Sequence, residues 1–117
     1  MKQLLLRLSV FISLAIFFSG CAFHGGYMAS SASLSSANFS YTKMNAMGKS
    51  STTYIFGIGG LDRETLVNDA KQDLLANNPL QSNQALSNVT VNFKMVTYAG
   101  IYGTSTCTVT ADIVTFK

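Results

Sequence analysis

The sequence contains few charged residues. Asp, Glu, Lys and Arg make up 11% of the 117 residues, whereas soluble proteins average about 25%. Two of the eight basic residues, Lys2 and Arg7, lie in the first twenty positions, so the rest of the chain carries a net charge of +1. A field this weak does not recruit nucleic acid or an anionic membrane surface. We therefore expect no nucleic-acid partner.

Residues suited to catalysis or metal binding are also scarce. His24 is the single histidine, and no general base accompanies the many Ser and Thr residues. Asp69 and Asp73 are one helical turn apart and could share a face, but no further candidate metal ligand lies near them in the sequence pattern. We therefore expect no enzymatic activity, no catalytic residues, no metal site and no cofactor.

The chain has no apolar run long enough for a typical membrane span. Residues 8–18 are apolar except for Ser9 and Ser13, and a spanning helix needs about 20 such residues. Behind Lys2 and Arg7, this shorter run suits the hydrophobic region of a signal peptide. Residues 1–20 could alternatively be an ordinary secretory signal peptide or an uncleaved membrane anchor.

The apolar run ends at Phe18-Ser19-Gly20-Cys21, which resembles the lipobox of bacterial lipoproteins, although Leu is usual where Phe18 stands. The resemblance implies cleavage between Gly20 and Cys21, acylation of Cys21, and attachment to a lipid bilayer. Two or three acyl chains hold a protein on a membrane far longer than one. An Asp directly after the lipidated cysteine resembles an inner-membrane retention signal, but this chain has Ala22 at that position. We therefore expect a lipid-anchored protein of the cell envelope, on the outer membrane and facing the periplasm or the cell surface.

The residues after the cysteine predict a flexible tether. Residues 22–36 are rich in Ser, Ala and Gly and carry no acidic or basic side chain, which is a linker composition. The predicted organisation is a signal peptide over 1–20, a lipidated cysteine and tether over 21–36, and a small domain over 37–117. His24 falls in the tether, so we expect it to be a solvated linker residue.

The remaining residues predict a small α+β domain. Strands are expected over 37–47, with a bulge, and over 52–58, joined by a turn at 48–51. Asp62 is the expected N-cap of a helix of about 14 residues, whose apolar stripe includes Leu66, Ala70 and Leu74 and which ends before Pro79. Apolar and polar residues then alternate over 89–95 and 106–113, around a turn at 100–103. The order β-β-α-β-β predicts a two-layer sandwich: a four-stranded antiparallel sheet with one packed helix.

Two segments of this domain are candidate binding sites. Tyr98, Ile101 and Tyr102 lie at the expected hairpin tip, where they can contact a partner or a membrane interface, or fold back over the sheet. Residues 57–62 form a glycine-rich loop before the helix, which is either a tight turn or an anion site. It is not a P-loop, because no Lys-Ser or Lys-Thr follows. Cys107 falls on the apolar side of its strand, so we expect a buried thiol.

With the lipobox, the Gly-Ile-Gly-Gly before the helix and the ending Thr-Val-Thr-Ala-Asp-Ile-Val, the chain resembles the short uncharacterised lipoproteins of Bacteroidetes. It is also similar to the TRL-like lipoproteins. These resemblances imply lipidation but no activity. We therefore expect a membrane-anchored, non-enzymatic binding or structural module with a protein or cell-wall partner. The alternative is a small-ligand or ion-binding lipoprotein that uses the loop at 57–62.

Overall fold

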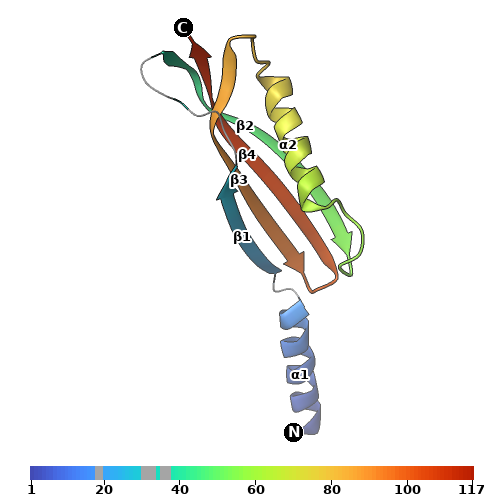
Figure 1. Ribbon diagram of the computed structural model, residues 1–117. Helices are drawn as coiled ribbons and strands as arrows, with labels where there is room; N and C mark the ends of the chain where they lie inside the picture. Colours follow the sequence, from blue (N-terminus) through green and yellow to red (C-terminus); the bar gives the residue numbers. More distant parts are fainter. Residues whose placement is uncertain (18–19, 30–33, 35–37) are drawn as a thin grey trace.

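The computed structural model describes all residues except 18–19, 30–33 and 35–37. Figure 1 shows an elongated molecule in which a twisted sheet carries one helix and a second helix projects from one end. The elements are α1 (Lys2–Phe17), β1 (Gly20–Met28), β2 (Phe39–Ile55), α2 (Arg63–Asn77), β3 (Gln84–Tyr98) and β4 (Tyr102–Phe116). The predicted α+β class is confirmed, but the first two strands are not the ones predicted.

The four strands form one antiparallel sheet in the order β1-β3-β4-β2. β3 and β4 form the central hairpin, and their register runs from Tyr98 opposite Tyr102 to Gln84 opposite Thr115. β1 pairs with the outer side of β3, and β2 pairs with the outer side of β4. The two N-terminal strands are therefore the edges of a sheet whose centre comes from the C-terminal part of the chain.

The predicted hairpin within residues 37–58 was wrong. Instead of turning at 48–51, β2 continues to Ile55, with register shifts between Tyr41 and Ala46 where a bulge was predicted. Gly48 occurs here for a packing reason. A Cβ added to it would lie 2.7 Å from the Cβ of Leu74, and closer still to the backbone of α2 at Ala70 and Leu74. The glycine lets the helix touch the strand backbone.

The predicted tether was wrong for residues 22–28. These residues belong to β1, which is exposed throughout and pairs with β3 along its whole length. Its pairing runs from Gly20 opposite Tyr98 to Met28 opposite Thr90. The Ser-, Ala- and Gly-rich composition suggested a linker because an edge strand exposed on both faces needs no alternation of apolar residues. Such a strand is stabilised by the hydrogen-bond ladder that β3 supplies. Residues 30–33 and 35–37 of the predicted tether lie outside the described residues.

The helix α2 agrees with its prediction. The Asp62 side chain accepts a hydrogen bond from the Thr65 amide at 3.3 Å, and the four buried side chains are the predicted stripe with Val67. The helix lies mainly over β2 and β4 (Figure 1). The core between helix and sheet is formed by Ala46, Leu66, Val67, Ala70, Leu74, Val89, Val91, Cys107, Val109, Ala111 and Ile113.

A carboxylate on β4 connects the bulges of its two neighbours. The backbone of Asn45 in β2 and the side-chain amide of Asn88 in β3 donate hydrogen bonds to the Asp112 carboxylate at 2.8 and 2.9 Å. Both asparagines have positive φ, at 55° and 51°, a conformation that Asn tolerates better than most residues. These hydrogen bonds lower the pKa of Asp112. Asp112 therefore ties three strands together where the ladder is irregular.

The helix α1 takes no part in this core. Its large apolar side chains are exposed, including Phe11 at 75% and Leu6 at 70%. Figure 1 shows it extending beyond the end of the sheet where β1 begins. Among the described residues, no helix combines the length and the hydropathy that crossing a bilayer requires.

Candidate functional site

The hairpin between β3 and β4 leaves two tyrosines and an isoleucine partly exposed to solvent, at a tip for which the sequence left both outward and folded-back side chains open. The turn has positive φ at Ala99 and Gly100, and the Ile101 amide donates to the Tyr98 carbonyl at 3.1 Å. Tyr98, Ile101 and Tyr102 are 53%, 44% and 45% exposed. The rings of Tyr98 and Tyr102 lie 6.0 Å apart. Each of these side chains therefore presents about half of its surface to solvent.

The glycine-rich loop after β2 forms a tight turn beside this hairpin. Ile55 and Ile58 exchange backbone hydrogen bonds at 2.9 and 3.1 Å, and Phe56 and Gly57 between them have positive φ. The turn directs Phe56 and Ile58 into solvent, where they are 70% and 78% exposed. Sequence reasoning missed these two side chains because residues 52–58 were assigned to a strand. The signal that marks them is their position on either side of Gly57.

The loop and the hairpin form one surface. The Phe56 amide donates to the Ile101 carbonyl at 2.6 Å, and Ile55 lies opposite Tyr102 in the β2–β4 ladder. We call this surface the apolar end, and its members are Ile55, Phe56, Ile58, Tyr98, Ile101 and Tyr102. Because hydrogen bonds join its two turns, the apolar end is a connected part of the fold.

Cys21 lies next to the apolar end. In β1, Cys21 is opposite Thr97, and Gly20 is opposite Tyr98. The contact is close, since a Cβ on Gly20 would lie 3.4 Å from the Tyr98 ring. Cys21 is exposed and has no disulfide partner among the described residues. The predicted lipidation site and the predicted contact residues are therefore brought together, although they are far apart in sequence.

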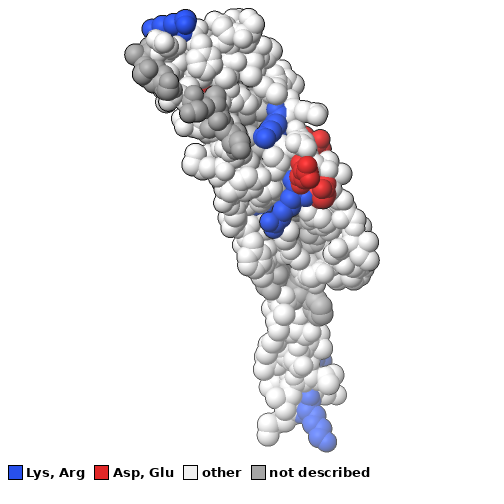
Figure 2. Space-filling model, in the orientation of Figure 1, with Lys and Arg blue, Asp and Glu red and all other residues white. Residues whose placement is uncertain are grey.

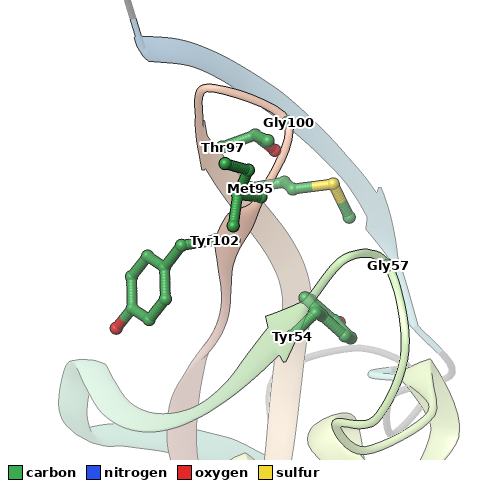
Figure 3. Close-up of a pocket in the computed structure, with 8 residues that line it drawn as sticks. Tyr54, Gly57, Met95, Thr97, Gly100 and Tyr102 are labelled. Atoms are coloured by element: carbon green, nitrogen blue, oxygen red, sulfur yellow. The ribbon is translucent and has the colours of Figure 1, made fainter. Parts of the chain in front are cut away.

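A cavity of about 330 Å³ is lined by residues of both the hairpin and the loop. Figure 3 shows Met95 and Thr97 on the hairpin side of this space, and Tyr54 and Gly57 on the loop side. Residues that face each other across an antiparallel pair share a face of the sheet, so Cys21 lies on the cavity side of β1 through its pairing with Thr97.

Charged side chains are absent from the two segments of sequence that supply this end. Residues 53–61 and 95–111 contain no Asp, Glu, Lys or Arg. On the face shown in Figure 2, the acidic side chains lie over α2, whereas the described atoms of the domain end beside α1 are uncharged. The apolar end therefore carries aromatic and aliphatic groups without a salt-bridging partner for a charged ligand.

The helix-free face of the sheet is a second distinctive surface. Thr104, Thr106, Thr108 and Thr110 alternate with the buried residues of β4, so their side chains face away from α2. By register, Thr108 lies between Asn92 and Lys49, and Thr106 lies between Lys94 and Ser51. We call this surface the hydroxyl face. It is an array of hydrogen-bond donors and acceptors with two lysines.

Two amides of the loop at 57–62 are occupied within the fold: the Ile58 amide donates to the Ile55 carbonyl and the Leu61 amide donates to the Thr52 hydroxyl, both at 2.9 Å. The Asp62 carboxylate occupies the start of α2, where an anion would otherwise bind.

The remaining candidate residues, Cys107, Asp73 and His24, lie in the core, on α2 and in β1, respectively. Cys107 is fully buried as predicted, and burial raises the pKa of its thiol. The Asp73 carboxylate accepts a hydrogen bond from the Lys49 amide at 2.9 Å, which satisfies an outward-facing group of edge strand β2. His24 lies in β1 opposite Lys94. The described residues contain no cluster of three His, Cys, Asp or Glu side chains able to hold a metal ion.

A family model of unknown function, DUF6567, matches residues 1–117. The chain belongs to the DUF6567 family. No curated protein matches, and no solved structure matches.

For this DUF6567 protein, the sequence indicated Cys21 and the hairpin tip as candidate sites but did not show that they lie close together. The predicted tether separated the two by a flexible segment, whereas β1 places Cys21 one residue from the partner of Tyr98. The second half of the apolar end, Phe56 and Ile58, completes the surface.

Proposed function

We propose that this DUF6567 protein is a membrane-anchored lipoprotein of the cell envelope. Acyl chains on Cys21 hold it on the bilayer after cleavage between Gly20 and Cys21. It acts there as a non-enzymatic binding or structural module. The observation that carries the proposal is the sequence order of positive charge, apolar run, small residues and cysteine over residues 2–21.

The architecture supports removal of a leader at this position. The apolar side chains of α1 are exposed, so cutting the chain before Cys21 removes nothing from the core. Cleavage would also remove an exposed apolar surface that is costly in water. Cys21 remains accessible on an edge strand, where a modifying enzyme can reach its thiol.

The hydroxyl face is the surface that we assign to an envelope partner. The hydroxyls of Thr104, Thr106 and Thr108 on β4, together with Lys49 and Lys94, offer hydrogen bonds to the polar groups of a protein or a cell-wall polymer. The rigid ladder keeps these groups in fixed positions, which lowers the entropy lost on binding. The sequence has a single histidine, His24, to serve as a base for its many Ser and Thr residues, and this histidine lies in β1 opposite Lys94, so the module is proposed to bind without catalysis.

The intact mass of the protein tests the anchoring directly. The full chain is expressed in a bacterium that processes lipoproteins and is purified from membranes in detergent. We expect a mass that lacks residues 1–20 and carries added acyl groups. Cys21→Ala should keep the leader and gain no lipid, whereas Cys107→Ala, the control at the buried cysteine, should be processed normally. A wild-type protein that retains its first twenty residues would refute the proposal.

A further inference from the structure

We infer that the apolar end lies in the headgroup region of the same bilayer that holds Cys21, so that the protein touches the membrane through side chains as well as through lipid. This inference rests on the proposed anchoring. The apolar end is defined above by six large side chains from two turns.

The first argument is position. Thr97 is opposite Cys21, and it immediately precedes Tyr98, the first member of the apolar end. The Phe56 amide then links the second turn to the first through the Ile101 carbonyl. A lipid attached at Cys21 therefore brings the two turns to the bilayer surface together, with no flexible segment between the lipid and the fold.

The second argument is exposure. Ile58 and Phe56 are 78% and 70% exposed, and the tyrosines are about half exposed. An exposed cluster of large apolar side chains at one end of a small domain indicates an interaction surface. Tyr combines an apolar ring with a polar hydroxyl, which suits the boundary between acyl chains and water.

The third argument is charge. Residues 53–61 and 95–111 contain no charged side chain that would have to be taken out of water. The charged residues that follow the loop, Asp62, Arg63 and Glu64, belong to the cap and first turn of α2 instead. A protein partner is less favoured here, because any such partner would have to share this end with the acyl chains on Cys21.

The absence of tryptophan from the sequence allows a direct test. The full chain carrying Ile58→Trp is purified as the acylated protein and reconstituted into phosphatidylcholine vesicles with or without bromine on the acyl chains. Bromine quenches indole fluorescence at short range. Phe116→Trp, at the opposite end of β4 and 41% exposed, is the matched control. Tyr98→Trp provides a second reporter if Ile58→Trp folds poorly.

We expect the Ile58→Trp protein to lose about half or more of its emission in brominated vesicles and to emit at shorter wavelength, because interfacial side chains reach the acyl boundary. The Phe116→Trp protein should emit equally in both vesicles. Equal emission of the Ile58→Trp protein in both kinds of vesicle would overturn the inference. A blue shift without quenching would also overturn it, because the indole would then be buried against protein and not against lipid. The intact mass of each sample separates the outcomes, since acylated protein without quenching refutes the inference but leaves the anchoring intact.

Discussion

Gly48 is the position where a single added methyl group should most affect the fold. A Cβ there would lie 2.7 Å from the Leu74 Cβ, and closer to the carbonyl oxygen of Ala70 and the amide nitrogen of Leu74. Ordinary carbon contacts are about 3.5–4.0 Å, so α2 would have to move away from β2 by about 1 Å. The clash involves backbone atoms, which cannot escape by changing a rotamer.

The expected cost of Gly48→Ala follows from overpacking. Extra atoms in a packed core cost about 1–3 kcal/mol, and sometimes more, and the backbone contacts place this variant at the upper end. A domain of about 100 residues loses about 4–8 °C of melting temperature per kcal/mol. We therefore expect Gly48→Ala to melt about 10–20 °C below the wild type.

Thermal unfolding followed by circular dichroism measures this difference. Gly25→Ala is the matched control, because Gly25 is also a strand glycine but nothing lies within 4 Å of an added Cβ. It should melt within a few degrees of the wild type or slightly above it, since alanine reduces the entropy of the unfolded chain. If the two variants melt at the same temperature, the helix does not rest on the backbone of β2 and the reasoning fails.

Two further predictions concern Asp112 and the hydroxyl face. Asp112→Asn should cost about 1–2 kcal/mol at pH 7, because it weakens hydrogen bonds to a partly exposed carboxylate. Hydrogen bonds lower the pKa of Asp112 in the folded state from its ordinary value of 3.8, so its contribution to stability is complete above pH 3.8 and is lost as the pH falls through the lower folded-state pKa. Urea unfolding should therefore show that the wild type is more stable than Asp112→Asn at pH 7 but not in strong acid. A stability difference that does not change with pH would contradict this role. For the hydroxyl face, a photo-crosslinking residue at Thr106 should form a discrete adduct in native membranes, whereas one at exposed Asn68 on α2 should not; equal labelling at both positions would remove the assignment.

The sequence predicted elements whose periodicity is enforced by burial. Leu66, Ala70 and Leu74 repeat at helical spacing, and Val109 and Ala111 alternate along β4, because each element has one face in the core. The cap at Asp62 was predicted for a local reason, since its carboxylate accepts from an amide three residues away.

The features that were missed depend on contacts between distant segments. Gly48 has the same local signature whether it makes a turn or admits a helix, and the choice is made by α2. β1 has no periodicity because neither face is buried, and its conformation is decided by the free edge of β3. The composition of the apolar end was visible in part, but the link from Phe56 to Ile101 arises from the register of β2 with β4.

The position of β1 has a consequence for the order of events during synthesis. Gly20, the first residue of β1, pairs with Tyr98, which is made almost at the end of the chain. Contacts between such distant segments form slowly, because the intervening chain must first be ordered. Under the proposed anchoring, the segment around Cys21 has no ladder to join during this interval and is open to the enzymes that would process it. Once the C-terminal hairpin has formed, pairing with β3 holds the backbone of this segment in the sheet, although the Cys21 side chain stays exposed.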